Sequence, residues 1–144
     1  MKKPQPPNIA VLGRAHRALL EDLRTLEEDV GPESAANLAE FRTRLGATYT
    51  HVCEHFRFEE QNGYMDEVMK REPRLQRIVQ VLGEEHRDLR QSLDALCGDI
   101  RLAASVDDAF REKVRQWIQR VRHHETRENE LVQDAFNCDL AAED

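Results

Sequence analysis

The stretch FREKVRQWIQRVRHHETRENEL, residues 110–131, decides the fold. Its apolar residues recur at steps of three and four positions, which is the periodicity of one face of an α-helix. Two ionisable residues, His124 and Glu128, continue the same series. The whole series is Phe110, Val114, Trp117, Val121, His124, Glu128 and Leu131. We therefore predict a helix that turns a histidine and a glutamate toward a hydrophobic core.

Three earlier segments show the same periodicity, and each carries a histidine within its series. The first series is Ile9, Leu12, His16, Leu19, Leu23, Leu26 and Val30. The second is Leu38, Phe41, Leu45, Thr48, Val52, His55 and Glu59. The third is Leu75, Leu82, His86, Leu89, Leu93, Leu96 and Ile100. Together with the last segment, these patterns predict four amphipathic helices.

Short breaks separate the four predicted helices. Gly31-Pro32 ends the first and Asn62-Gly63 ends the second, while Glu72-Pro73 precedes the third. The connection between the second and third, residues 64–70, has room for one short helical piece. Short links favour antiparallel neighbours, so we predict an all-α fold, an antiparallel up-down-up-down four-helix bundle.

The two halves of the chain also resemble each other. GRAHR at residues 13–17 matches GEEHR at residues 83–87. In each half a second histidine, His55 or His124, is followed four residues later by a glutamate. The first and second histidines are 39 residues apart in one half and 38 in the other. We therefore expect two related helical hairpins whose special residues meet.

Six ionisable residues occupy core-facing positions of this bundle: His16, His55, Glu59, His86, His124 and Glu128. Burying a carboxylate without a partner is costly, so these positions need a physical explanation. One explanation is a satisfied polar layer, in which the histidines cap the glutamates by hydrogen bonds. The other is a metal site, because side chains that converge from four facing helices are how bundles bind metal ions. The matched pairs of histidines favour metal.

The types of ligand narrow the choice of metal. Imidazole mixed with carboxylate suits iron, manganese or zinc, and the absence of thiolate argues against a structural zinc site. Six ligands exceed the need of one tetrahedral ion, so we expect two ions. Glu59 and Glu128, one in each hairpin, are placed to bridge them. Each ion then takes two histidines, one from each helix of a hairpin.

These residues resemble the hemerythrin-like family, also called the HHE cation-binding domain. The motif is His16, then His55 to Glu59, then His86, then His124 to Glu128, and His123-His124-Glu125 matches the run that gives the domain its name. The resemblance implies two iron ions with a carboxylate bridge and an oxo or hydroxo bridge. It also implies an open position for a small ligand: dioxygen, peroxide or nitric oxide.

One departure from oxygen-carrying hemerythrins lies on the third helix. Those proteins have a further histidine one turn from the first, whereas Leu82 and Arg90 occupy the positions one turn from His86. The missing nitrogen argues against reversible oxygen carriage. His51, four residues before His55, is a candidate extra ligand, although its place beside the core face is more typical of a side chain that supports the ligands.

The bulk composition suits a single helical domain of 144 residues. We expect a flexible N-terminal arm at residues 1–8, the bundle at 9–137 and a C-terminal tail at 138–144. The net charge is −7 and no long run of like charges occurs, so we expect no nucleic-acid partner. Without an 18-residue apolar run we expect no membrane span.

The three cysteines, Cys53, Cys97 and Cys138, are isolated in the sequence and odd in number. No CxxC pair occurs, and the N-terminus lacks the apolar stretch of a signal peptide. This pattern favours reduced thiols and a cytoplasmic location.

Three hypotheses of function follow. The first is a cytoplasmic diiron protein that binds or reduces a small oxidant; whether it turns over as an enzyme is left open. The second is a non-enzymatic module that senses iron or oxygen through its stability. The third is a metal-free bundle with a polar core layer. Oligomeric state, redox partner and physiological ligand are beyond what the sequence determines.

Overall fold

The computed structural model describes residues 7–31, 37–137 and 140 of the chain. Every regular element in these ranges is helical, which confirms the all-α prediction. The elements are α1 (Pro7–Asp29), α2 (Leu38–Asn62), α3 (Tyr64–Arg71), the 3₁₀-helix η1 (Pro73–Leu75), α4 (Gln76–Leu102) and α5 (Asp108–Phe136). The predicted arm and tail fall largely outside the described residues. No described helix combines the length and apolar character that crossing a membrane requires.

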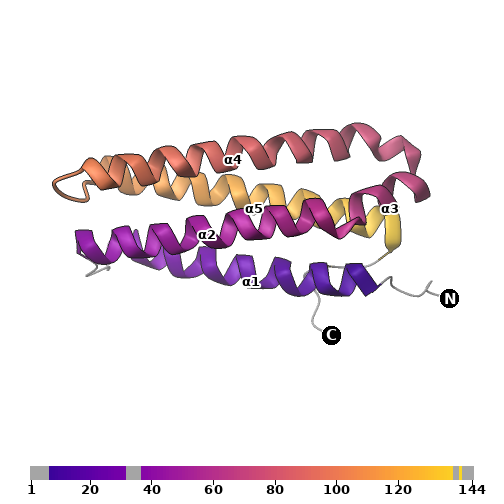
Figure 1. The fold of residues 1–144 in the computed structure, drawn as a ribbon, viewed down its shortest axis with the longest axis horizontal. Helices are drawn as coiled ribbons and strands as arrows, with labels where there is room; N and C mark the ends of the chain where they lie inside the picture. Colours follow the sequence, from indigo (N-terminus) through magenta and orange to yellow (C-terminus); the bar gives the residue numbers. More distant parts are fainter. Residues whose placement is uncertain (1–6, 32–36, 138–139, 141–144) are drawn as a thin grey trace.

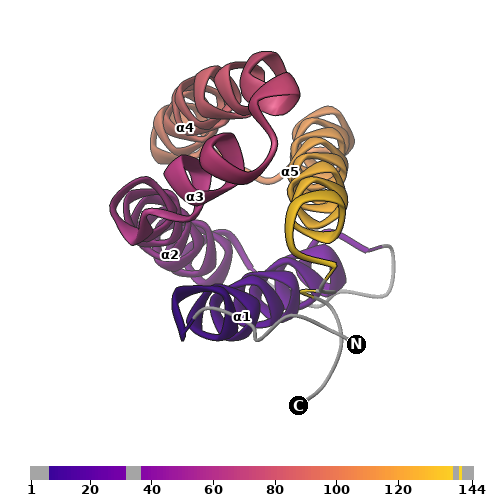
Figure 2. The same ribbon diagram turned by 90° about the vertical axis from the view of Figure 1, so that its right-hand side faces the viewer.

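The four long helices lie lengthwise beside one another (Figure 1). Contacts run from α1 to α2, from α2 to α4, from α4 to α5 and from α5 back to α1. Viewed along the helices, they surround a common interior, and the short α3 lies across one end (Figure 2). α3 also contacts α2, α4 and α5. One end of the interior is therefore covered by a separate helix.

Local sequence signals explain where the long helices begin and end. The side chain of Asn37 accepts a hydrogen bond from the backbone N–H of Glu40 at 2.9 Å, and Asp107 does the same for Phe110 at 2.8 Å. Such caps satisfy backbone donors that a helix leaves free at its first turn. Gly63 ends α2 with φ at 87°, a left-handed conformation that favours glycine. The chain can therefore turn directly from α2 into α3.

The core consists of two hydrophobic clusters with an ionisable layer between them. The larger cluster extends from the middle of the bundle toward the α4–α5 connection and includes Leu23, Phe41, Leu93 and Trp117. The smaller one lies under α3 and includes Leu12, Val68 and Leu82. The buried ionisable residues of the long helices belong to neither cluster: His16, His55, Glu59, His86, His124, Glu125 and Glu128. Apolar packing on both sides thus keeps this layer away from water.

Candidate metal centre

All six residues that the sequence pattern selected are buried in the structure, each with 8% exposure or less. They come from all four long helices, as the periodicity required. The structure therefore gathers them into the middle of the bundle instead of spreading them over its surface. What they contact decides whether they form one site.

The first group comprises Glu59, His86, His124 and Glu128. One ligand atom from each lies within 4.8 Å of the others. Nε2 of His86 is 3.2 Å from Oε1 of Glu128 and 3.5 Å from Oε2 of Glu59. His124 makes an ion-pair contact with Glu128 one turn along α5. This group has the two-histidine, two-carboxylate set that was expected for one ion.

The second group comprises His55, Glu59 and Glu125, again with ligand atoms within 4.8 Å of one another. Nε2 of His55 is 3.2 Å from Oε1 of Glu125 and also contacts Glu59. His16 joins through Glu125, because its Nδ1 lies 2.7 Å from Oε2 of that carboxylate. Glu59 belongs to both groups, so the two groups share one carboxylate.

Glu125 is a member of the site that the sequence pattern did not select. It is only 1% exposed and faces the two histidines of α1 and α2. The series from Phe110 to Leu131 marks one narrow line of core positions along α5, and Glu125 lies about 100° from His124 around the helix axis. A helix at a bundle corner buries a stripe at least that wide, so its position directly after His124 was the available signal.

Outer carboxylates brace the histidines of α4 and α5. Nδ1 of His86 lies 3.2 Å from Oε1 of Glu60, which also accepts a hydrogen bond from Arg90 at 3.3 Å. Nδ1 of His124 lies 2.8 Å from Oε1 of Glu85. When such a ring is neutral and donates its Nδ1 proton outward, it turns the lone pair of Nε2 toward the centre. This is the arrangement by which carboxylates orient metal-binding histidines.

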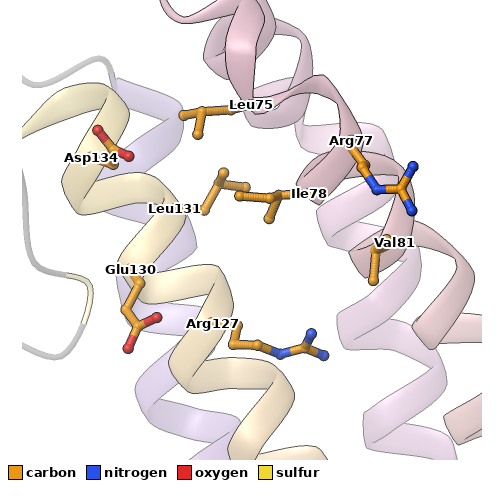
Figure 3. A pocket seen from close by; sticks show the side chains of 8 residues that line it. All are labelled: Leu75, Arg77, Ile78, Val81, Arg127, Glu130, Leu131 and Asp134. Atoms are coloured by element: carbon orange, nitrogen blue, oxygen red, sulfur yellow. The ribbon is translucent and has the colours of Figure 1, made fainter.

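A groove of about 370 Å³ opens between α4 and α5 beside this brace (Figure 3). Its apolar lining comes from Leu75, Ile78, Val81 and Leu131. Arg127 also lines the groove, and its guanidinium donates to both oxygens of Glu85. His124 is therefore linked through Glu85 to Arg127, a residue that lines a surface groove.

Two imidazoles of the metal-free cluster have strongly raised pKa values. Burial lowers the pKa of His55, but hydrogen bonds with Glu125 and Glu59 outweigh it and raise that pKa to about 11. Burial also lowers the pKa of His86, and hydrogen bonds with Glu128 and Glu59 raise it to about 10. Both rings are therefore cationic at neutral pH when no metal neutralises the carboxylates.

The two glutamates of the first group have opposite pKa shifts. Burial, followed by the charges of Glu128 and Glu125, raises the pKa of Glu59 to about 8. Burial also favours a raised pKa at Glu128. Hydrogen bonds with Glu59, His124 and His86 outweigh it and hold this pKa well below its ordinary value. Ionising Glu59 is thus unfavourable in the metal-free cluster, and a bound cation would favour its charged form.

The donor atoms fit a metal ion better than a closed hydrogen-bond network. Among the described residues, Oε1 of Glu59 and Nε2 of His124 are buried without a hydrogen-bond partner, although each closely approaches an ionisable neighbour. Ligands at ~2.0–2.2 Å from one ion lie at most ~4.4 Å apart, and the ligand atoms of each group lie within 4.8 Å of one another. Atoms that converge without hydrogen-bond geometry are arranged as ligands around a point. The buried groups can therefore hold a metal ion.

His51 lies apart from the centre. Its side chain is 51% exposed and its Nδ1 is 3.0 Å from Oδ2 of Asp22 on α1. The positions one turn from His86 also lack a nitrogen ligand. Leu82 packs in the smaller hydrophobic cluster, and Arg90 pairs with Glu60. Among the residues that the structure describes, no further histidine therefore joins the group of Glu59, His86, His124 and Glu128.

Tyr64 was also missed, because residues 64–70 were treated as a connection. It is completely buried, and its hydroxyl donates to Oε2 of Glu128 at 2.9 Å and to Oε2 of Glu59 at 3.4 Å. Burial, followed by the charges of Glu128 and Glu59, raises its pKa well above the ordinary value. The signal in the sequence was Gly63, which permits a sharp turn immediately before an aromatic residue.

Comparison with protein families matches residues 8–136 to the hemerythrin HHE cation binding domain. The chain belongs to this family. The match spans all four long helices and hence both groups of buried ligand atoms. Comparisons with curated proteins and with solved structures gave no match. The HHE assignment and the buried histidine and glutamate groups together support cation binding.

Proposed function

We propose that this HHE domain is a non-haem diiron protein that binds or reacts with a small oxidant, such as dioxygen, peroxide or nitric oxide. One ion takes Glu59, His86, His124 and Glu128. The other takes His16, His55 and Glu59, with Glu125 as an added ligand. The observation that carries the proposal is Glu59, whose carboxylate belongs to both groups of ligand atoms and can bridge two ions.

Different residues would orient the ligands and exclude water at such a centre. The braced imidazoles of His86 and His124 present Nε2 inward, and the hydrophobic clusters on either side exclude bulk water. Bound iron supplies the Lewis-acid and redox chemistry. The absence of a further histidine beside His86 leaves room for an exchangeable ligand or a non-histidine donor.

An up-down-up-down order of the long helices, as two related hairpins, is the fold we propose for this centre. The ring of contacts through α1, α2, α4 and α5 supports it. Each hairpin then supplies one of the two pairs of histidines. The described cysteines Cys53 and Cys97 are unpaired, which supports a reducing compartment such as the cytoplasm.

Anaerobic titration with ferrous iron tests this function. We expect two ferrous equivalents per chain to bind, and we expect ultraviolet absorption bands of a bridged diferric centre to develop after oxygen or peroxide is added. Zinc-loaded protein is the matched control, because zinc occupies similar ligands without changing its oxidation state. Binding of two irons with no spectral change on oxidation would leave a cation-binding protein and contradict the oxidant chemistry.

A sensing module is the second candidate, and the charge distribution of the metal-free cluster favours it. Glu59 is fully buried with a raised pKa, so the metal-free chain carries an internal cost that a cation removes. We expect the melting temperature to rise by many degrees when iron binds. Equal melting temperatures with and without iron would exclude a sensor that works through stability.

A further inference from the structure

Tyr64 occupies a position at the centre that its surroundings do not explain by packing alone. It is the first residue of α3, it is 0% exposed, and its ring packs in the smaller hydrophobic cluster. Its hydroxyl, however, points out of this apolar cluster and donates to the carboxylates of Glu59 and Glu128. A phenylalanine would fill the same cluster without placing a polar atom there.

We propose that Tyr64 is a metal ligand, whose phenolate oxygen binds the ion held by Glu59, His86, His124 and Glu128. This proposal rests on the proposed diiron function. It assigns the site a donor set of two imidazoles, two carboxylates and one phenolate.

The distances support a ligand position. The Tyr64 oxygen is 2.9 Å from Oε2 of Glu128 and 3.4 Å from Oε2 of Glu59. Two ligands that lie at right angles around an ion, each at ~2.0–2.2 Å, have donor atoms ~2.8–3.1 Å apart. The phenol oxygen therefore lies near the spacing of an adjacent ligand.

The chemistry of the surrounding atoms supports the same position. Both described partners of the hydroxyl are carboxylates that accept hydrogen bonds, so one phenolic proton is shared between two acceptors. A cation at this point replaces that proton and attracts all three oxygens. Binding would replace the O–H bond of Tyr64 by an oxygen–metal bond and would release the phenolic proton to solvent. No oxidation state changes in this step.

The backbone holds Tyr64 in place. Gly63 adopts φ of 87°, where other residues are strained, and α3 begins directly after this turn. Val68, one turn further along α3, is also buried. α3 is thus anchored across the end of the bundle with Tyr64 directed inward. On α4, the position one turn before His86 holds Leu82, which packs in the smaller hydrophobic cluster and offers no donor atom.

Spectroscopy of the iron-loaded chain tests the proposal directly. Phenolate bound to ferric iron gives a visible charge-transfer band, and excitation into this band enhances the ring vibrations of the tyrosinate. We expect the band in the oxidised wild-type protein and its complete loss in Tyr64→Phe. The sequence contains one other tyrosine, and Tyr49→Phe is the matched control that retains the band.

A second measurement needs no variant. Wild-type protein grown with ring-deuterated tyrosine must show shifted ring vibrations if a tyrosinate binds the iron. Protein that binds two irons without a phenolate band, or with vibrations that do not shift, overturns the tyrosine ligand and leaves the diiron proposal standing. Protein that binds no iron overturns the proposed function itself.

Discussion

The two halves of the centre, which the internal repeat makes equivalent, differ in how their histidines are held. In the α4–α5 half, the Nδ1 atoms of His86 and His124 contact carboxylates outside the centre. In the α1–α2 half, His16 and His55 both contact Glu125, a carboxylate inside it. Carboxylates outside the centre therefore orient the histidines of α4 and α5, whereas one carboxylate inside the centre links the histidines of α1 and α2.

The difference can be traced to pairs of repeat-related positions. Glu85, directly before His86, braces His124, whereas its counterpart before His16 is Ala15. Glu125 directly follows His124, whereas the residue after His55 is Phe56. Phe56 stacks on the His86 ring with centroids 4.3 Å apart and planes 9° apart. The repeat therefore preserves the positions of the histidines and glutamates, while their neighbours make the two groups of ligand atoms unlike each other.

The largest effect is expected from the residue that the halves share. Glu59→Gln removes one negative charge and the bridge from both groups, so we expect iron content to fall from two ions per chain to fewer than one. Elemental analysis after anaerobic loading measures this. Glu54→Gln, an exposed change on the same helix, should keep two ions. Retention of both ions by Glu59→Gln contradicts a shared bridge.

Loss of Glu125 should impair metal binding in the α1–α2 half and spare the α4–α5 half. Glu125→Gln removes the carboxylate that His16 and His55 contact, so we expect about one ion per chain, held by His86 and His124. Stoichiometry from titration with ferrous iron measures this, with the exposed Glu130→Gln as the control. If the variant still binds two ions with unchanged affinity, Glu125 is only a hydrogen-bond acceptor in the metal-free chain.

A smaller effect is expected from Glu85, the carboxylate that contacts Nδ1 of His124 in the α4–α5 half. Glu85→Gln weakens the orientation of His124, and loss of such a partner typically lowers metal affinity about 10–100-fold. Competition with a chelator measures the affinity of each ion. Glu84→Gln alters the exposed neighbouring residue and should have no effect. Equal weakening of both ions would show that the halves are not independent.

The smallest effect is a pH dependence of the metal-free chain. The pKa values of His55 and His86 are raised to about 11 and about 10, so their stabilisation is complete below their ordinary value of 6.5 and is lost as pH rises toward those values. Glu59, with its pKa raised to about 8, adds a loss between its ordinary value of 4.5 and about 8. We expect the melting temperature to fall from pH 6.5 to pH 9.

Bound metal should remove this pH dependence, because it replaces the protons on the ligands. The metal-dependent rise in melting temperature should therefore increase with pH over the same interval. Melting curves of the metal-free and metal-loaded chain at three pH values test both statements. A melting temperature of the metal-free chain that rises with pH would contradict the charge arrangement described above.

Much of this centre was predictable because helical periodicity determines which residues share a face. The six selected residues are all buried, and Asn62-Gly63 does end the second helix. Periodicity along one line does not report the width of the buried stripe, so Glu125 was missed. It also does not report where a short helix crosses the bundle, and the position of Tyr64 depends on tertiary packing of α3.

The most direct test of two ions sharing Glu59 is anomalous X-ray diffraction from crystals of the iron-loaded chain. We predict two iron peaks about 3.5–4 Å apart, one beside His86 and His124 and the other beside His16 and His55, with the Glu59 carboxylate between them. A single peak, or two peaks without Glu59 between them, would contradict the account.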